Sequence, residues 1–218
     1  MELWLDSANP EDVRTALNWG VISGVTTNTT KILQTGRGFR DVIDEICGLM
    51  GNKPVSVMAV EGEYKNAETI VKEGEQLVEW HPNVVVKIPP TIEGIKAIRT
   101  LSGMDIKTNA TLVFAPTQAL LAAKAGATFV SPFVGRLDPT GHDGMDLVRN
   151  IKIIFDNYCL NTKIVIAAAR QPIHVLKGAL IGAAIATMTL DTLELLYRHP
   201  LTDEGLKTFL EDWKKVPK

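Results

Sequence analysis

The chain has 218 residues, of which 45% are hydrophobic and 22% are charged, and 23 Lys and Arg residues against 25 Asp and Glu residues leave a formal net charge of −2. This composition is that of an ordinary globular protein and excludes the disordered, collagen-like and disulfide-scaffold classes. Because nucleic-acid binding depends on clustered cations and the sequence has no dense run of Lys or Arg, we expect no nucleic-acid partner.

The sequence carries no sign of export or of a membrane span. It opens with Met-Glu-Leu-Trp-Leu-Asp, which lacks the basic segment, long apolar stretch and cleavage site of a signal peptide. The nearest approach to an apolar span, residues 178–190, is too short to cross a bilayer. The two cysteines, Cys47 and Cys159, lie far apart and form no CxxC pair, which favours reduced thiols. The protein is therefore predicted to be cytoplasmic.

Eight short apolar runs, rich in β-branched residues, are predicted to be strands. They cover residues 3–5, 24–27, 55–60, 84–86, 108–114, 129–134, 164–166 and 185–190. Apolar residues recur at helical spacing between these runs, for example over residues 39–50 and 147–158. Residues typical of helix ends agree, since Asn9-Pro10 and Pro116 can open helices and Gly51 can close one.

The alternation of strand and helix predicts an α/β fold, a (βα)₈ TIM barrel formed by residues 1–218 as one domain. The strand starts recur every 26 residues or so, about the length of one βα unit. An open doubly wound sheet would fit the same alternation, but eight near-equal units favour a closed barrel. Residues 202–215 carry an apolar stripe and predict an extra C-terminal helix, whose stripe needs a partner on the barrel or on a neighbouring subunit. This stripe consists of Leu206, Phe209, Leu210 and Trp213.

Polar residues stand at the end of nearly every predicted strand. In a (βα)₈ barrel the reactive groups lie where the strands end, because these ends ring one face of the barrel. We therefore expect these side chains to converge on one site. In chain order they are Asp6, Asn28, Glu61, Lys87, Asn109 with Thr111, Ser131 with Arg136, and Arg170.

Lys87 is the most informative of these residues. It follows Val84-Val85-Val86, so its amine belongs to a strand that otherwise has the pattern of a fully buried one. Burial disfavours the charged form of an amine and lowers its pKa. A neutral amine in an apolar pocket is what attack on a carbonyl and Schiff-base formation require. The alternative is a lysine paired with a carboxylate for structural reasons.

The other candidates have weaker individual signals. Asp6 ends a strand, but it can equally be a turn or helix-cap residue. The clusters at residues 26–30 and 107–111 can be ordinary turn chemistry. Arg136 and Arg170 follow the sixth and seventh strands, where barrel enzymes often hold a phosphate, and their guanidinium groups suit phosphate oxygens. The alternative for each arginine is an ordinary surface position.

The sequence indicates neither a metal site nor a nucleotide site. Four histidines lack the spacing of metal ligands and are interpreted as structural, and no glycine-rich nucleotide loop is present. These histidines are His81, His142, His174 and His199.

Taken together, these residues resemble the small transaldolases, a family that also includes the fructose 6-phosphate aldolases. The resemblance extends over essentially the whole chain, and its motifs are specific. The matching stretches are residues 5–9, 24–28, 85–89, 108–114, 119–126, 131–136, 199–205 and 209–213. The resemblance implies a transferase of the pentose phosphate pathway that uses no cofactor and no metal.

Carried over residue by residue, the resemblance implies an aldol transfer through a Schiff base. Lys87 attacks C2 of sedoheptulose 7-phosphate or fructose 6-phosphate, Glu61 and Thr111 position a proton-carrying water, and Asp6 takes the C4 hydroxyl proton. The dihydroxyacetone unit left on Lys87 then passes to glyceraldehyde 3-phosphate or erythrose 4-phosphate. The implied substrate-binding residues are Asn28, Asn109, Ser131, Phe133, Arg136 and Arg170.

Two positions distinguish a transaldolase from an aldolase in this resemblance. The transaldolases carry phenylalanine in the Ser-Pro-Phe stretch and glutamate on the third strand, where the aldolases carry tyrosine and glutamine. Phe133 and Glu61 therefore favour the transferase. Glu61 is placed by ungapped spacing to Lys87, and a shifted register puts Met58 or Ser56 at that point instead.

Two further positions depart from the family pattern. Thr29 stands where proline usually follows Thr-Thr-Asn, and Ala168 stands where a phosphate-binding serine usually precedes the arginine. The missing hydroxyl at Ala168 is expected to weaken phosphate binding by about 1 kcal/mol.

Two alternatives and an expected assembly accompany this interpretation. A fructose 6-phosphate aldolase would release free dihydroxyacetone, and a non-catalytic sugar-phosphate-binding barrel would leave Lys87 unreactive. A decarboxylase or isomerase would need a metal cluster or another acid–base pair, and the sequence offers neither.

The short members of the family assemble as rings, commonly decamers, so the expected partners are sugar phosphates and further copies of the chain in a ring-based homo-oligomer.

Overall fold

A computed structural model describes residues 1–60 and 64–217 of the chain. Its strands form one closed parallel barrel in which each strand pairs with the next in sequence and β8 closes on β1. The strands are β1 (Glu2–Asp6), β2 (Ile22–Thr26), β3 (Val55–Met58), β4 (Val84–Ile88), β5 (Thr108–Val113), β6 (Phe129–Pro132), β7 (Lys163–Ala169) and β8 (Ile185–Met188).

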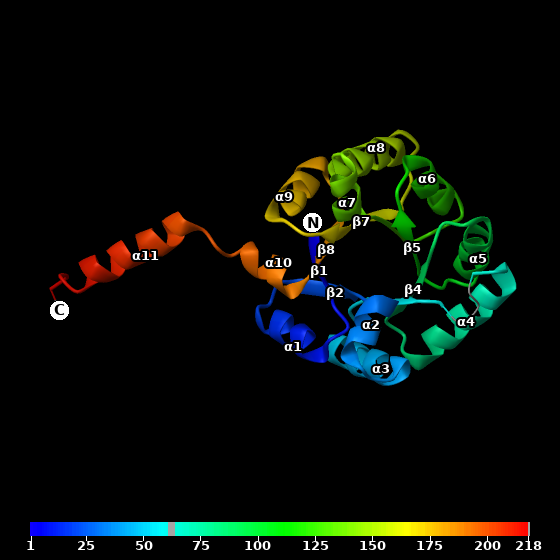
Figure 1. Ribbon diagram of the computed structural model, residues 1–218, viewed down its shortest axis with the longest axis horizontal. Coiled ribbons are helices and arrows are strands. Elements are labelled where there is room, and N and C mark those ends of the chain that lie inside the picture. The colour runs from blue at the N-terminus through cyan, green and yellow to red at the C-terminus, as the bar shows by residue number, and fades with distance from the viewer. Residues whose placement is uncertain (61–63, 218) are drawn as a thin grey trace.

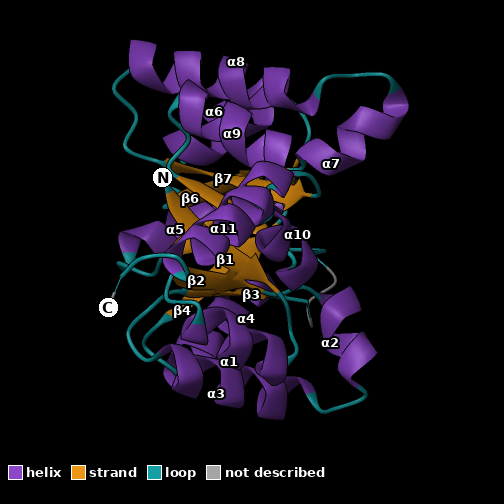
Figure 2. Cartoon of the chain, turned by 90° about the vertical axis from the view of Figure 1, so that its left-hand side faces the viewer, coloured by secondary structure: helices purple, strands orange, loops and turns teal. Residues whose placement is uncertain are grey.

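Helices alternate with the strands, and most of them cover the outer face of the barrel (Figures 1 and 2). They are α1 (Pro10–Asn18), α2 (Thr29–Thr35), α3 (Phe39–Met50), α4 (Ala67–Trp80), α5 (Ile92–Gly103), α6 (Pro116–Lys124), α7 (Val134–Leu137), α8 (Gly144–Asn157), α9 (Pro172–Ile181), α10 (Leu190–Leu195) and α11 (Pro200–Trp213), with a 3₁₀ turn at Asp138–Thr140. The prediction of a TIM barrel with an extra C-terminal helix is confirmed.

The helix ends follow the predicted capping chemistry. The side chain of Asn9 accepts the amide of Glu11 and caps α1, with Pro10 as the first helical residue. Gly51 closes α3, and Pro116 opens α6. The interpretation of Asp6 as a cap is wrong, because Asn9 fills that role and Asp6 is the last residue of β1.

The third strand is shorter than predicted and ends at Met58 instead of Val60. The amide of Val60 donates to a side-chain oxygen of Glu73 on α4 at 2.5 Å instead of to a neighbouring strand. Within the sheet, Met58 is the register partner of Lys87 on β4. The predicted site residue Glu61 lies outside the described residues.

An apolar layer fills the lower part of the barrel interior. Trp4 meets Phe129 edge to face, with ring centroids 5.3 Å apart. Gly24 on β2 is the register partner of Trp4, and a Cβ added to it would stand 2.4 Å from a carbon of the indole ring, so only glycine leaves room for the indole. The layer consists of Trp4, Val85, Phe129, Val165 and Ile185.

Side chains alternate along a strand, so the residues two positions further along point into the barrel one level higher. At this upper level the apolar layer gives way to Asp6, Thr26, Lys87, Ser131 and Thr187. The polar site therefore lies on an apolar floor at the C-terminal ends of the strands, as the fold requires.

Two strands bulge at the height of this polar level. The register of β5 shifts between Ala110 and Val113, and that of β7 shifts between Ile166 and Ala169. Each bulge contains a non-glycine residue in the left-handed region, Leu112 at φ 57° and Ala168 at φ 55°. Such bulges re-aim the side chains beside them and are common next to active sites.

The C-terminal helix α11 projects away from the barrel (Figure 1). None of its residues is buried. Phe209 is 75% exposed and Trp213 is 71% exposed. The predicted apolar stripe is therefore present and uncovered within the chain. Among the helices of residues 1–60 and 64–217, none has the length and apolar character needed to cross a bilayer.

Candidate active site

A cavity of about 250 Å³ opens at the C-terminal ends of the strands. Residues at or just after the C-terminal ends of β1, β2, β4, β6, β7 and β8 line this cavity, so the convergence predicted from strand ends is present. The predicted residues that line it are Asp6, Asn28, Lys87, Ser131, Phe133, Arg136 and Arg170.

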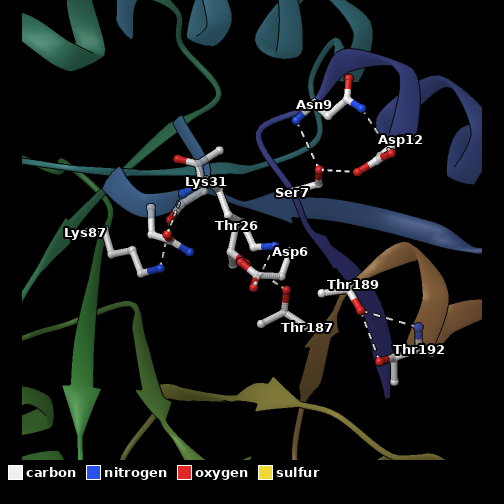
Figure 3. A network of polar contacts seen from close by, with 12 residues as sticks. Asp6, Ser7, Asn9, Asp12, Thr26, Lys31, Lys87, Thr187, Thr189 and Thr192 are labelled. Carbon is white, nitrogen blue, oxygen red and sulfur yellow. Dashed lines mark hydrogen bonds and ion pairs between the residues drawn. The ribbon is translucent and has the colours of Figure 1, made fainter. Parts of the chain in front are cut away.

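Lys87 lies in β4 with 4% of its surface exposed. Its Nζ donates a hydrogen bond to the backbone carbonyl of Thr27 at 2.9 Å (Figure 3). Burial lowers the pKa of this amine, the positive charges of Arg136 and Lys31 lower it further, and the charge of Asp6 opposes them. Among the described residues, no carboxylate forms an ion pair with Lys87.

Asp6 is held at the end of β1 by a chain of hydroxyl groups. The Thr26 hydroxyl donates to its Oδ1 at 3.0 Å, and the hydroxyls of Thr26 and Thr187 are 2.8 Å apart. The ammonium group of Lys31 on α2 lies 3.7 Å from Oδ2 (Figure 3). The carboxylate is thus fixed on the same cavity as Lys87, with part of its surface still open to a ligand.

Thr111 lies on a second, smaller cavity of about 170 Å³ that shares Lys87 with the first. Its hydroxyl is buried and has no hydrogen-bond partner among the described residues. Because a buried polar group without a partner is costly, this hydroxyl is available to a ligand or a water beside Lys87. Met58 lines the same cavity, at the place on β3 that the shifted register indicated.

The two asparagines have different surroundings. The Asn28 carbonyl oxygen caps α2 by accepting the amide of Lys31 at 3.0 Å, and the residue lines both cavities. Asn109 is fully buried, and its side chain links Ser56 at 3.0 Å to Ser131 at 2.8 Å. Asn109 does not line either cavity, so the structure places it behind Ser131, and its predicted contact with a substrate stays a prediction.

Arg136 follows β6 and Arg170 follows β7, whereas Lys31 follows β2. In the closed barrel the two arginines therefore lie across the cavity from Lys31. Arg136 belongs to α7, where its guanidinium lies over the Phe133 ring at 5.2 Å, and Arg170 directly follows β7. Both side chains are exposed, and neither pairs with a carboxylate of the described residues. Two unpaired guanidinium groups at one cavity rim can bind an oxyanion such as phosphate.

Thr187 and Lys31 of the site are not among the candidates from the sequence, and Thr26 is included there only as part of the cluster at residues 26–30. Thr26 and Thr187 follow Gly24 and Ile185 by two positions, so the strand alternation alone could have found them. Lys31 belongs to α2, a short helix whose sequence resembles an ordinary loop. The histidines are not gathered at the site, and the described residues contain no group of three or more metal-binding side chains.

Comparison with known proteins finds full-length relatives. A family profile described as Transaldolase/Fructose-6-phosphate aldolase matches residues 3–218. The chain is 54% identical to a protein named "Probable transaldolase" from Aquifex aeolicus (strain VF5), over 100% of this chain and 98% of that protein. Proteins of the same name from Geotalea daltonii and Dictyoglomus turgidum are 52% and 53% identical to the chain, and each is covered completely, as is the chain.

Among solved structures, the phosphoenolpyruvate phosphomutase from Streptomyces platensis subsp. rosaceus has a similar fold, with a TM-score of 0.61 and 15% sequence identity. The match covers 99% of this chain and 94% of that one. At this identity the likeness concerns the barrel architecture alone.

Proposed function

Because this chain belongs to the transaldolase/fructose-6-phosphate aldolase family, we propose that it is a transaldolase that works through a Schiff base on Lys87. It transfers a dihydroxyacetone unit from sedoheptulose 7-phosphate or fructose 6-phosphate to glyceraldehyde 3-phosphate or erythrose 4-phosphate, a step of the pentose phosphate pathway. The observation that carries this proposal is a buried amine with a lowered pKa on the same cavity as Asp6 and two unpaired arginines.

The first stage is formation of the Schiff base. The neutral amine of Lys87 attacks C2 of the ketose phosphate and forms a carbinolamine, whose hydroxyl group leaves as water when it is protonated. Thr111 supports this stage, since its buried hydroxyl has no partner among the described residues and can hold the water that carries the proton. We assign Glu61 as the second group on this water, and Met58 occupies the strand position opposite Lys87.

The second stage is cleavage of the C3–C4 bond. Asp6 accepts the proton of the C4 hydroxyl, the C4 carbonyl forms, and the electron pair of the C3–C4 bond flows into the iminium group to give an enamine. The aldose phosphate departs, and the three-carbon unit stays attached to Lys87. Attack of this enamine on the carbonyl of a second aldose phosphate, with Asp6 returning the proton, forms the Schiff base of the product ketose. Addition of water to C2 of this Schiff base then releases the product and regenerates the amine of Lys87.

The substrate is held at both ends in this scheme. Arg136 and Arg170 bind the phosphate group that donor and acceptor share, and Ser131 and Phe133 form the wall between them and Lys87. Asn28 binds a hydroxyl of the three-carbon unit through its amide nitrogen, because its carbonyl oxygen already caps α2. Asn109 acts on the same unit through Ser131, whose hydroxyl it accepts.

Phe133 favours the transferase over a fructose 6-phosphate aldolase. Its ring lies against Arg136 and within 5.9 Å of Phe114, so it adds an apolar wall and no hydroxyl beside the bound unit. A wall of this kind limits hydrolysis of the bound intermediate by water. The three-carbon unit therefore stays on Lys87 until an acceptor arrives.

The proposal is tested by trapping the intermediate. Fructose 6-phosphate and borohydride are added to the wild type and to Lys87→Met, and the adduct is located by peptide mass spectrometry, with erythrose 4-phosphate supplied in a parallel assay. We expect a three-carbon adduct on Lys87 and formation of sedoheptulose 7-phosphate. An adduct with release of dihydroxyacetone and no transfer would indicate the aldolase, and no adduct at all would indicate a non-catalytic binding barrel.

We also propose that the chain works as a homo-oligomer in the cytoplasm. The exposed stripe on α11 and a second exposed apolar face on α9, formed by Ile173, Leu176 and Leu180, support contact with further copies. Two different faces of one chain in contact generate a ring when the rotation closes. The free thiols of Cys47 and Cys159 are in keeping with a reducing compartment.

A further inference from the structure

His174 connects the two segments that carry the arginines of the site. It lies on α9 with 6% of its surface exposed. Its Nδ1 accepts the backbone amide of Arg170 at 3.2 Å, and its Nε2 lies 2.9 Å from Oδ2 of Asp138. Since the backbone amide can only donate, Nδ1 is the acceptor and Nε2 carries the proton that is shared with the carboxylate. One neutral imidazole therefore spans both segments.

Asp138 fixes the other end of this connection. It stands two positions after Arg136, in the 3₁₀ turn that follows α7. Its second oxygen, Oδ1, accepts the amide of Gly144 at the start of α8 with a 2.9 Å hydrogen bond. The carboxylate thus ties the segment of Arg136 both to His174 and to α8.

A close backbone contact brings the same two segments together a second time. An added Cβ at Gly135 would stand 2.2 Å from the carbonyl oxygen of Ala168. The backbone of α7 therefore packs directly on the bulge of β7, one residue before Arg136 and two residues before Arg170. This contact sets how near the segments come, and the polar pair of His174 and Asp138 sets their relative position.

We propose that His174 and Asp138 are positioning residues that fix Arg136 and Arg170 as one oxyanion-binding unit. Both guanidinium groups are exposed and lack carboxylate partners in the described chain, so their placement depends on the backbone that bears them. The inference rests on the proposed function, in which these arginines bind the phosphate of the substrate. Neither His174 nor Asp138 lines the cavity, so both act through the arginines.

Amide side chains can separate the two hydrogen bonds of the imidazole. His174→Asn places an oxygen near the position of Nδ1 and retains the bond to the Arg170 amide, whereas His174→Gln places its NH₂ near the position of Nε2 and retains the bond to Asp138. His174→Ala removes both bonds. Lys177→Met is the matched control, because it removes an ion pair of 2.8 Å between the same helix and Asp143 and leaves both hydrogen bonds of His174 in place.

The readout is the ratio of kcat/KM for fructose 6-phosphate to kcat/KM for fructose, measured with the same acceptor, alongside melting temperatures. Loss of both bonds in His174→Ala is expected to lower this ratio about 10-fold through KM for the phosphorylated sugar, with the constants for fructose little changed. His174→Asn and His174→Gln are expected to give smaller losses, and Lys177→Met none. If His174→Ala is too unstable to assay, the two amide variants and Asp138→Ala carry the test.

The outcomes separate this inference from the proposed function. A wild type that shows no preference for the phosphorylated sugar overturns the role of the arginines, and the positioning role with it. A wild-type preference that survives in the His174 variants overturns the positioning role alone. An equal loss for both sugars would mark His174 as a purely structural residue and would also overturn it.

Discussion

Lys87 illustrates how one residue is prepared by groups from several strands. Its carbonyl partner, Thr27, follows β2, and the charges that act on it come from Asp6, Lys31 and Arg136. Desolvation is the largest of these influences and lowers the pKa of the amine. The sequence contains the lysine, but the balance of charges around it exists only in the closed barrel.

Removing the positive charge of Lys31 is expected to raise the pKa of Lys87, since that charge lowers it in the wild type. In Lys31→Met a larger fraction of Lys87 is then protonated at a given neutral pH, so Schiff-base formation slows there and recovers at higher pH. The check is the pH dependence of the borohydride-trapping rate, whose midpoint should move upward. Lys96→Met, which removes a surface lysine paired with Glu93, is the control and should leave the midpoint in place.

Thr111→Val separates stability from activity. The Thr111 hydroxyl is buried without a partner among the described residues, so replacing it by a methyl group should leave the melting temperature unchanged or raise it. Loss of the group that holds the proton-carrying water should slow Schiff-base formation by about 10- to 100-fold. A marked fall in melting temperature would show that the hydroxyl has a structural role instead.

At the scale of elements, the bulge in β7 shapes the side of the site that carries Arg170. Ala168 occupies the bulge in a left-handed conformation, and it lines the cavity between Ala167 and Arg170. A side chain in this position faces the cavity, and its residue takes no part in the regular hydrogen-bond ladder of the sheet. The bulge therefore makes residue 168 a natural place for an extra hydrogen-bond donor.

Ala168→Ser is expected to lower KM for sugar phosphates about 5-fold, because the added hydroxyl supplies one more donor worth about 1 kcal/mol. Steady-state kinetics with fructose 6-phosphate check this result, and KM for unphosphorylated fructose should stay unchanged. An unchanged or higher KM for the phosphorylated sugar would contradict it.

The elements also show what the sequence could predict. All eight strands were found, because each is a compact β-branched or apolar run between helical repeats. The short helices α2 and α7 were not, since four to seven residues give too little periodicity to distinguish a helix from a loop. The predicted end of β3 is too late, because the amide of Val60 donates to the side chain of Glu73 on the next helix, α4, a contact that the local strand pattern does not specify.

For the site, strand ends predicted most of the cavity wall but not its support. Asp6, Lys87 and Arg170 could be found because each stands at or just beyond the end of an apolar run. Lys31 and His174 could not, since each acts through a contact between elements that the local sequence does not specify.

At the scale of the whole molecule, α11 is expected to hold copies of the chain together. Phe209→Glu combined with Trp213→Glu places two charges on the exposed stripe, where burial against another subunit would be costly. We expect this double variant to elute as a smaller species in size-exclusion chromatography with light scattering, with its circular dichroism unchanged. Lys207→Glu, on the same helix and outside the stripe, makes the same change in charge and provides the control. Retention of the wild-type mass by the stripe variant would contradict the prediction.

The apolar floor of Trp4, Phe129 and their neighbours has a kinetic consequence. Because it closes the barrel axis below Lys87, the departing aldose and the incoming aldose of the proposed transfer must use the same mouth at the opposite end. Donor and acceptor therefore cannot occupy their places together, and the reaction must follow a double-displacement order. Initial velocities plotted in double-reciprocal form should then give parallel lines, with the two ketose phosphates competing for the free amine of Lys87 and the two aldose phosphates competing for the enamine.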